Sequence, residues 1–266
     1  MSKVVLITGA SSGIGKQVAL YLHNKNYTVY GTSRNPDKVK VPFSMLALDL
    51  TKSKTIRSVV EKIQQQQTSI DVLINNAGRG IAGPIEETPI DEMRVNFETN
   101  FFGVIELIKV VLPVMRKQQN GLIINITSIA SYTGLPFRGI YSASKGALAL
   151  VTEALSMELK SLGIKCLTIA PGEFATNIDA SRFHTPVFEK SAYKEKYSTN
   201  LALMNKQLKR GKDPVLIAQL ICSIIESKNH KIHYKIGSFI EKFSIVLKRI
   251  LPDKIYQKLM MNHFKL

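Results

Sequence analysis

The sequence predicts an α/β fold with a parallel β-sheet covered by helices on both faces. Short apolar runs ending in turns alternate with longer segments of helical spacing up to residue 237. Such alternation indicates repeated strand–helix–strand crossovers, which build a doubly wound parallel sheet. The 266 residues show no internal repeat and no flexible linker, which favours one domain over two. We therefore expect a single domain over residues 1–237 and a C-terminal extension over residues 238–266.

The individual elements follow from apolar periodicity. Continuous apolar runs predict strands buried on both faces, at Val4–Thr8, Tyr27–Gly31, Phe43–Leu48, Ile70–Ile74, Leu122–Ile126 and Ile164–Ile169. Helical spacing predicts helices at Ile14–Asn26, Ser53–Gln67, Asp91–Lys117 and Tyr141–Leu162. Pro113 predicts a kink in the third of these helices or its early end, because proline cannot donate a backbone hydrogen bond. Residues 171–213 lack clean periodicity and are expected to form a lid over a substrate.

Composition excludes several classes of protein. Hydrophobic residues make up 45% of the chain and charged residues 21%, as in ordinary globular proteins, which excludes wholesale disorder. Cys166 and Cys222 lie far apart in apolar runs, so we expect a reducing compartment such as the cytoplasm. No window reaches the roughly 18 uncharged apolar residues of a membrane span, and the N-terminal run is too short for a signal peptide. The expected protein is cytoplasmic, or at most peripheral to a membrane.

The net charge of +16 is unusual. Nine basic and only two acidic residues fall within residues 227–266. Such an excess is typical of proteins that bind nucleic acid, an anionic membrane surface or anionic ligands. No recognisable nucleic-acid-binding module accompanies it, so nucleic acid is not the expected partner.

A glycine-rich turn, TGASSGIG at residues 8–15, lies between the first strand and the first helix. Glycines allow a tight turn and a close approach of the backbone to a pyrophosphate, and a helix N-terminus offers free N–H donors. Glycine also serves plain turns, but the position after a strand favours a dinucleotide site. The expected cofactor contacts in this turn are Gly9, Ser11, Ser12, Gly13, Ile14 and Gly15.

The residues at the end of the second predicted strand indicate whether NAD or NADP(H) is the cofactor. An NAD site usually places an acidic residue here, whereas this chain has Ser33 followed by Arg34. A guanidinium at this point can bind a 2′-phosphate, so NADP(H) is the expected cofactor. The alternative is that Arg34 is a solvated loop residue.

A tyrosine and a lysine four residues apart, Tyr141 and Lys145, share one face of a predicted helix. A free tyrosine has a pKa of about 10, and a nearby ammonium lowers it. The pair could move a proton to or from a carbonyl or alcohol oxygen. Ser128, just past the fifth strand, could donate a hydrogen bond to the same oxygen, and Asn100 could anchor a water. The Tyr-x-x-x-Lys spacing alone is common by chance.

Together these motifs resemble the short-chain dehydrogenases/reductases, over residues 3 to about 237. TGASSGIG resembles the family's cofactor loop, and Asn75–Gly78 (NNAG) resembles its sheet-stabilising turn. Asn100 in NFFG, Ser128 in ITSIAS, and Tyr141 and Lys145 in YSASK match its catalytic tetrad. The resemblance implies a Rossmann fold, no metal, and a homodimer formed through the helices that carry Asn100 and Tyr141.

The resemblance also assigns roles to single residues. Tyr141 would be the general acid/base, Lys145 would lower its pKa and hold the nicotinamide ribose, Ser128 would orient the substrate carbonyl, and Asn100 would hold a relay water. Further cofactor contacts would come from Asp49 at the adenine and from the NNAG and Pro-Gly motifs, namely Asn76, Ala77, Gly78, Pro171, Gly172, Phe174 and Thr176.

Aromatic and apolar residues of the lid, such as Phe183, Phe188 and Tyr197, favour a lipophilic substrate.

The C-terminal extension has apolar residues at the spacing of an amphipathic helix, namely Phe239, Phe243, Val246, Leu247 and Ile250. A second short helix is expected after Pro252. This basic element could lie on a membrane, or it could pack over the cleft or the core. It resembles extensions in the retinol and 17β-hydroxysteroid dehydrogenase branch.

The expected activity is NADP(H)-dependent interconversion of a lipophilic ketone or aldehyde and its alcohol. The alternative is a non-catalytic nucleotide sensor or nucleic-acid-binding protein on the same fold. The basis of this alternative is the net charge of +16. The presence of both Tyr141 and Lys145 favours the enzyme instead.

Overall fold

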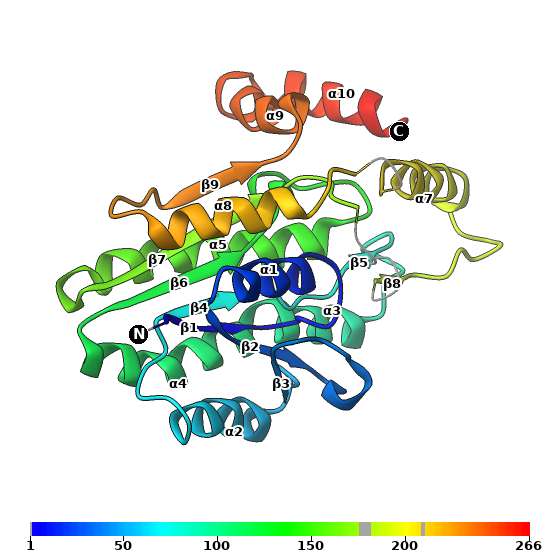
Figure 1. Cartoon of the computed structure of the whole chain (residues 1–266). Helices are drawn as coiled ribbons and strands as arrows, with labels where there is room; N and C mark the ends of the chain where they lie inside the picture. The colour runs from blue at the N-terminus through cyan, green and yellow to red at the C-terminus, as the bar shows by residue number, and fades with distance from the viewer. Residues whose placement is uncertain (1, 176–181, 209–210) are drawn as a thin grey trace.

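The computed structural model describes residues 2–175, 182–208 and 211–266 of the chain. Its main sheet has seven strands in the order β3-β2-β1-β4-β6-β7-β9 (Figure 1). The strands are β1 (Val4–Ile7), β2 (Thr28–Ser33), β3 (Ser44–Ala47), β4 (Val72–Asn75), β6 (Gly121–Ile126), β7 (Ile164–Pro171) and β9 (His233–Ile236). All neighbouring strands in this sheet are parallel, which confirms the predicted fold class.

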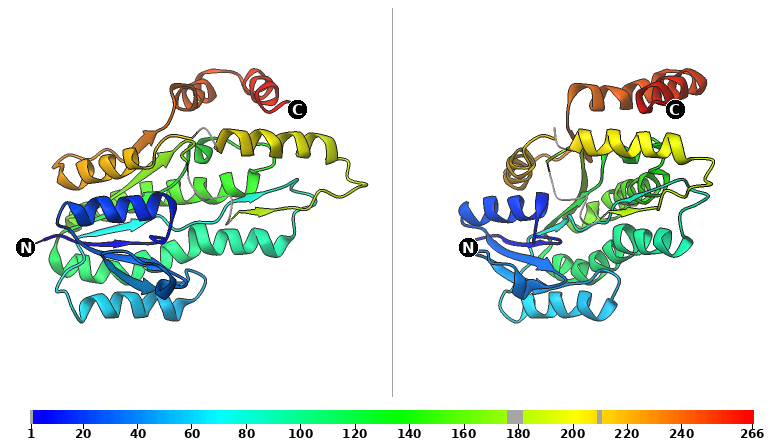
Figure 2. Two further views of the ribbon diagram at one scale, coloured as in Figure 1. Left: turned by 45° about the vertical axis from the view of Figure 1, so that its right-hand side comes forward. Right: turned by 90° about the vertical axis from the view of Figure 1, so that its right-hand side faces the viewer.

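Helices cover both faces of the sheet. The described helices are α1 (Gly13–Asn24), α2 (Ser53–Gln64), α3 (Ile90–Phe97), α4 (Gly103–Gln118), α5 (Gly139–Glu158), α7 (Lys194–Leu208), α8 (Val215–Glu226), α9 (Phe239–Ile250) and α10 (Asp253–Phe264). Helices α2, α4 and α5 pack on one face and α1 and α8 on the other. Figure 2 shows these layers from two further directions, with α9 and α10 beyond β9 at one edge of the molecule.

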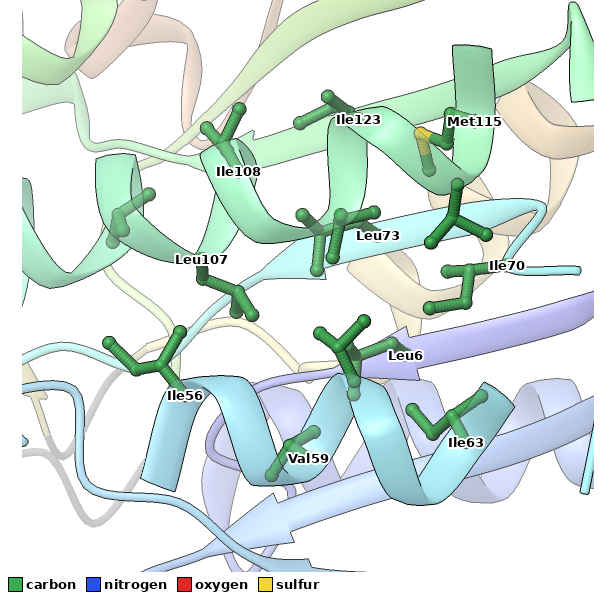
Figure 3. Packing of buried hydrophobic residues seen from close by; sticks show 14 of the residues in the cluster. Leu6, Ile56, Val59, Ile63, Ile70, Leu73, Leu107, Ile108, Met115 and Ile123 are labelled. Carbon is green, nitrogen blue, oxygen red and sulfur yellow. The ribbon is translucent and has the colours of Figure 1, made fainter. Parts of the chain in front are cut away.

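The hydrophobic core lies on both sides of the sheet because neighbouring strand residues point to opposite faces. In β1, Leu6 packs in the cluster under α2 and α4, whereas Val5 and Ile7 pack in the cluster under α1 and α8. Figure 3 shows Ile56 and Ile63 of α2, with residues of α4, closing over Leu6 and Leu73. The continuous apolar runs in the sequence are therefore explained by burial on both faces.

The strand order predicts where a ligand binds in this fold. The chain runs from β1 outward to β3, then crosses back to β4, which pairs with β1 on the other side. Ligands of open α/β sheets bind beyond the carboxyl ends of the strands at such a reversal. The turns that follow β1 and β4, which hold the TGASSGIG and NNAG motifs, therefore meet at this point.

The predicted helix Asp91–Lys117 is present, but it is not a regular α-helix throughout, and the early end considered at Pro113 is wrong. It is interrupted by a π-helical turn, η2 (Glu98–Phe102), and α4 continues through Pro113 to Gln118. Proline costs a helix interior about 3 kcal/mol. Pro113 is exposed, and burial of the apolar face that includes Leu107, Val111 and Met115 outweighs this cost.

The region 171–213, in which the sequence shows no clean periodicity, contains the helix α7 and the short strand β8 (Phe183–His184). Strand β8 pairs with β5 (Ile81–Ala82), which follows β4, in a second, two-stranded sheet. The pattern was missed because α7 has weak apolar periodicity and is held by contacts to distant segments.

Candidate active site

The turn after β1 has the conformation that its glycines predict. Gly9 and Gly13 have φ angles of +69° and +54°, which side chains rarely adopt. A Cβ atom on Gly15 would lie 2.3 Å from the carbonyl oxygen of Gly9, so the close turn excludes any side chain there. Helix α1 starts at Gly13 without a side-chain cap from Ser12 and without an acidic residue in its first turn. Its first N–H groups are thus oriented to bind an anion such as a pyrophosphate.

The turn after β4 is hydrogen-bonded to the glycine-rich turn after β1. The Thr8 hydroxyl accepts hydrogen bonds from the N–H groups of Asn76 (3.0 Å) and Ala77 (2.9 Å). The Asn76 side-chain amide donates in return to the carbonyl groups of Thr8 (2.9 Å) and Gly9 (3.2 Å). The predicted cofactor residues of both motifs therefore surround one crevice.

The end of β2 lies beside the same loop, since the N–H of Ala10 donates to the carbonyl of Thr32 (2.9 Å). Arg34 follows two residues later and is exposed, next to the half-buried Ser33. Its charge reaches Asp49, which follows β3. Partial burial opposes ionisation of Asp49, but hydrogen bonds from Thr51 and the charges of nearby lysine and arginine side chains hold its pKa below the ordinary value. The predicted 2′-phosphate and adenine ligands thus lie together at one side of the crevice.

Tyr141 lies in the first turn of α5, beside Ser128, which caps the short helix η3 (Ile129–Tyr132) after β6. Burial raises the pKa of Tyr141, while a hydrogen bond with Ser128 and the charges of Arg182 and Arg138 lower it; burial prevails. Tyr141 therefore carries its proton at neutral pH. Neither arginine was singled out in the sequence, although Arg138 is only three residues from Tyr141. Arg182 comes from the lid region and had no local signal.

Lys145 is buried one turn further along α5, with 4% of its surface exposed. Its ammonium donates to the backbone carbonyl of Ile126 (2.9 Å), at the end of β6. Burial lowers the pKa of Lys145 to about 8. A Cβ atom on Gly78 would lie 3.3 Å from the Lys145 nitrogen and 3.1 Å from Oδ1 of Asn100, so glycine keeps this corner open.

Asn100 is fully buried within η2. Its Oδ1 accepts from the N–H of Arg79 (2.8 Å), and its Nδ2 donates to the Arg79 carbonyl (2.9 Å) and to the Ser144 hydroxyl (3.2 Å). Asn100 therefore joins the segment after β4 to α5. Single π-helical turns are frequent at functional sites, and this one turns the amide toward the crevice side of Gly78.

The Pro-Gly motif lies at the end of β7. The N–H of Gly172 donates to the carbonyl of Ile236 (2.7 Å), and a Cβ atom on Gly172 would collide with the carboxylate of Glu241 at 2.3 Å. The side chain of Phe174 packs in the core beneath α8 and is 3% exposed, so it does not face the crevice as the resemblance implied. Thr176 lies outside the described residues.

The lid region packs on the segment that follows β4. Tyr197 of α7 is buried, donates to the carbonyl of Ala82 (2.9 Å), and its ring contacts that of Phe137 at 5.2 Å. Phe137 immediately precedes the arginine beside Tyr141 and has a φ of +56°, which is uncommon for a bulky residue. Phe183 lies under the guanidinium of Arg79 at 5.7 Å. Aromatic side chains of residues 182–208 therefore pack against the segment after β4 and the segment before α5.

These parts have the geometry of a nicotinamide-dependent oxidoreductase: a glycine-rich turn at the sheet reversal and a group formed by the half-buried Ser128 and Tyr141 and the buried Lys145. Residues 3–186 match the family described as short chain dehydrogenase. The chain belongs to the short-chain dehydrogenase/reductase family and is an enzyme that acts on alcohol or carbonyl groups with a nicotinamide cofactor.

Relatives and solved structures agree with this membership. The chain is 39% identical over 256 residues to a 3-ketodihydrosphingosine reductase of Bacteroides thetaiotaomicron, covering 96% of this chain and 95% of that protein. It is 35% identical over 188 residues to human retinol dehydrogenase 8, covering 66% of this chain and 60% of the relative. A short-chain dehydrogenase from Streptomyces avermitilis superposes with a TM-score of 0.83 at 29% identity, covering 100% and 96% of the two chains.

Proposed function

We propose that the protein is an NADP(H)-dependent oxidoreductase that interconverts a lipophilic ketone or aldehyde and its alcohol, with Tyr141 as general acid/base. The observation that carries the proposal is the half-buried Tyr141 in the first turn of α5, hydrogen-bonded to Ser128. A protonated phenol next to a hydroxyl can donate to the oxygen of a carbonyl as it becomes an alcohol.

The cofactor, when bound, supplies or accepts the hydride. Tyr141 then supplies the proton to the substrate oxygen, and Ser128 holds that oxygen by a second hydrogen bond. Lys145, buried one turn further along α5, is the residue that would hold the nicotinamide ribose. Asn100 keeps the segment around Arg79 in place against α5.

The preference for NADP(H) rests on Arg34. It stands exposed at the end of β2, where Ser33 replaces the acidic residue of an NAD site. A structure of ElxO with NADP bound superposes with a TM-score of 0.71 at 28% identity, covering 89% of this chain and 98% of that chain, and its cofactor supports the proposal.

The lipophilic substrate is inferred from the aromatic side chains of residues 182–208. The names of two relatives, 3-ketodihydrosphingosine reductase and retinol dehydrogenase 8, refer to lipid substrates and support it.

A homodimer through α4 and α5 is part of the proposal, because Leu150 and Met157 of α5 are 68% and 70% exposed. A Met157→Lys variant that stays dimeric by light scattering, or a native tetramer, would count against this interface.

The test of the proposed function is turnover of long-chain ketones and aldehydes with NADPH by the native protein and by Tyr141→Phe. We expect turnover to fall about 100-fold to 10,000-fold in the variant. NADPH binding, followed by fluorescence titration, should be retained, which separates lost chemistry from misfolding. Tyr132→Phe is the matched control, because this half-buried tyrosine lies outside the catalytic group. Full activity in Tyr141→Phe would contradict the proposal.

A further inference from the structure

The C-terminal extension, residues 238–266 with helices α9 and α10, has few buried side chains. Ile245 of α9 and Tyr256 and Phe264 of α10 are 3%, 3% and 4% exposed and form its buried contacts. Phe264 lies against the guanidinium of Arg138 at 5.5 Å. At its start, Ser238 and Glu241 form a capping box that fixes the first turn of α9.

The apolar face of α9 points away from the body. Phe239, Ile240 and Ile250 are 76%, 73% and 67% exposed, and the rings of Phe239 and Phe243 stack at 5.6 Å. On a helix Phe239, Phe243 and Ile250 share one face, and Ile240 lies at its border. Glu241 lies on the other side, toward the core. A surface helix of a globular protein normally has the opposite orientation, with its apolar stripe on the core.

Helix α10 also carries exposed apolar side chains. Among the described residues, nineteen large apolar side chains are exposed, and eight of these lie in residues 239–261. Scattered exposed apolar side chains are normal, but such a concentration marks an interaction surface. We call it the docking face; it consists of Phe239, Ile240, Phe243, Val246, Ile250, Ile255, Leu259 and Met261.

The charges next to the docking face are mostly positive. Lys242, Arg249, Lys254 and Lys258 are exposed on the same two helices. Both acidic residues of the extension are engaged, since Glu241 accepts backbone hydrogen bonds and Asp253 lies 3.2 Å from Lys248. A second copy of the chain would bring the same positive charge against itself. An apolar face with a basic surround instead matches an anionic lipid surface.

We propose that α9 and α10 dock the enzyme on an anionic bilayer, with the docking face buried among the lipid headgroups. None of the helices in the described parts of the chain is long and apolar enough to cross a membrane, so the contact is interfacial. In Figure 2 the two helices lie at an edge of the molecule, where a flat surface can approach them. The docking itself is independent of the proposed reaction.

The two helices contact segments that are close in sequence to the Pro-Gly motif and to Tyr141. Glu241 of α9 binds the segment after the Pro-Gly motif, and Phe264 of α10 packs on Arg138, three residues before Tyr141. A bilayer below the extension therefore lies next to the lid side of the site. For a lipophilic substrate, which rests on the proposed function, this arrangement shortens the path from lipid to Tyr141.

The test is vesicle flotation of the full-length protein. Vesicles of phosphatidylcholine alone are compared with an equimolar mixture of phosphatidylcholine and phosphatidylglycerol. We expect the native protein to float with the mixed vesicles and to be released by salt, because screening weakens the attraction of basic residues to anionic lipid. The double variant Phe239→Ser/Ile250→Ser should lose about tenfold or more in vesicle affinity. Lys242→Glu/Arg249→Glu should lose about fivefold for each basic residue removed.

The matched control is Ile90→Ser/Leu162→Ser, which removes two exposed apolar residues outside the extension. It should float like the native protein, and all variants should keep NADPH binding and turnover of a water-soluble ketone.

Two results would overturn the docking: a native protein that floats with neither kind of vesicle, or a Phe239→Ser/Ile250→Ser variant that floats unchanged. If that variant instead dissociates a native oligomer without flotation, the face is a contact between copies and the docking is again overturned. Loss of turnover in Tyr141→Phe would leave flotation untouched, so the two proposals fail separately.

Discussion

The carboxylate of Glu241 accepts a hydrogen bond of 2.6 Å from the backbone N–H of Glu173. The same carboxylate accepts a second bond of 2.6 Å from the N–H of Ser238. It occupies the space that a Cβ atom on Gly172 would need, so glycine at that position is required for the contact. The first turn of α9 is therefore fixed to the Pro-Gly segment at the end of β7, and the extension is coupled to the crevice.

Replacement of Glu241 by alanine should weaken both the extension and cofactor binding. Two part-buried N–H groups lose their acceptor, which costs about 1–3 kcal/mol for a buried donor. We expect a lower free energy of unfolding and weaker NADPH binding, measured by denaturation and by fluorescence titration. Glu195→Ala, an exposed change on α7, is the control. Unchanged NADPH affinity in Glu241→Ala would show that the contact does not reach the cofactor.

The Arg34→Ala variant should lose selectivity for the phosphorylated cofactor. A charge-assisted hydrogen bond contributes about 1.5–3 kcal/mol, so NADPH affinity should fall about 10-fold to 100-fold while NADH affinity stays the same. Arg57→Ala, which removes an exposed arginine of α2, is the control and should change neither affinity. Equal losses for both cofactors would mean that Arg34 does not bind the 2′-phosphate.

Arg138 should tune the acid–base chemistry of Tyr141. Its positive charge lowers the pKa of Tyr141, so Arg138→Met should raise that pKa further. In alcohol oxidation the phenolate is the base, and kcat/KM rises with pH through the pKa of Tyr141. We expect this rise to move to higher pH in Arg138→Met and to return toward the native position in Arg138→Lys, which keeps the charge. A profile that does not move in Arg138→Met would contradict this electrostatic role.

The buried Lys145 should make stability depend on pH. Its pKa falls from 10.5 to about 8 on folding, so between these values the unfolded chain binds more protons than the native protein. Stability therefore rises with pH across this window, by about 3 kcal/mol from this group. Cys166, whose pKa burial raises to about 12, acts in the opposite direction above pH 9.

The difference between native protein and Lys145→Met isolates the lysine, because the cysteine is present in both. The stability of the variant relative to the native protein should decline as pH rises from about 8 to 10.5, measured by urea unfolding at each pH. A difference that stays constant across this window would show that Lys145 is not desolvated.

Much of the fold was predictable because its signals are local. Val5, Leu6 and Ile7 must be apolar in any strand buried on both faces, and the same holds along β4, β6 and β7. The positive φ of Gly9 and the close approach at Gly15 restrict these positions to glycine, so the cofactor loop could be located without coordinates. Tyr141 and Lys145 share a helix face through their spacing alone.

Other features depend on contacts between distant segments. Arg182 comes from the lid region and reaches Tyr141 through space, and Asn100 lies in a π-helical turn that its own sequence does not predict. Helix α7 is held by Tyr197 against Ala82, across 115 residues of chain. No periodicity within α7 could have indicated that contact.

The sequence by itself determined the parallel sheet, the glycine-rich turn after β1 and the shared helix face of Tyr141 and Lys145, because short-range sterics and periodic burial act within a few residues. Tertiary structure alone decided which charges surround Tyr141 and which way the extension faces. The spacing of Phe239, Phe243 and Ile250 predicts an amphipathic helix equally well for a stripe on the core and a stripe on the outside. The hydrogen bonds of Glu241 fix its polar face inward, and the apolar face is thereby left outward.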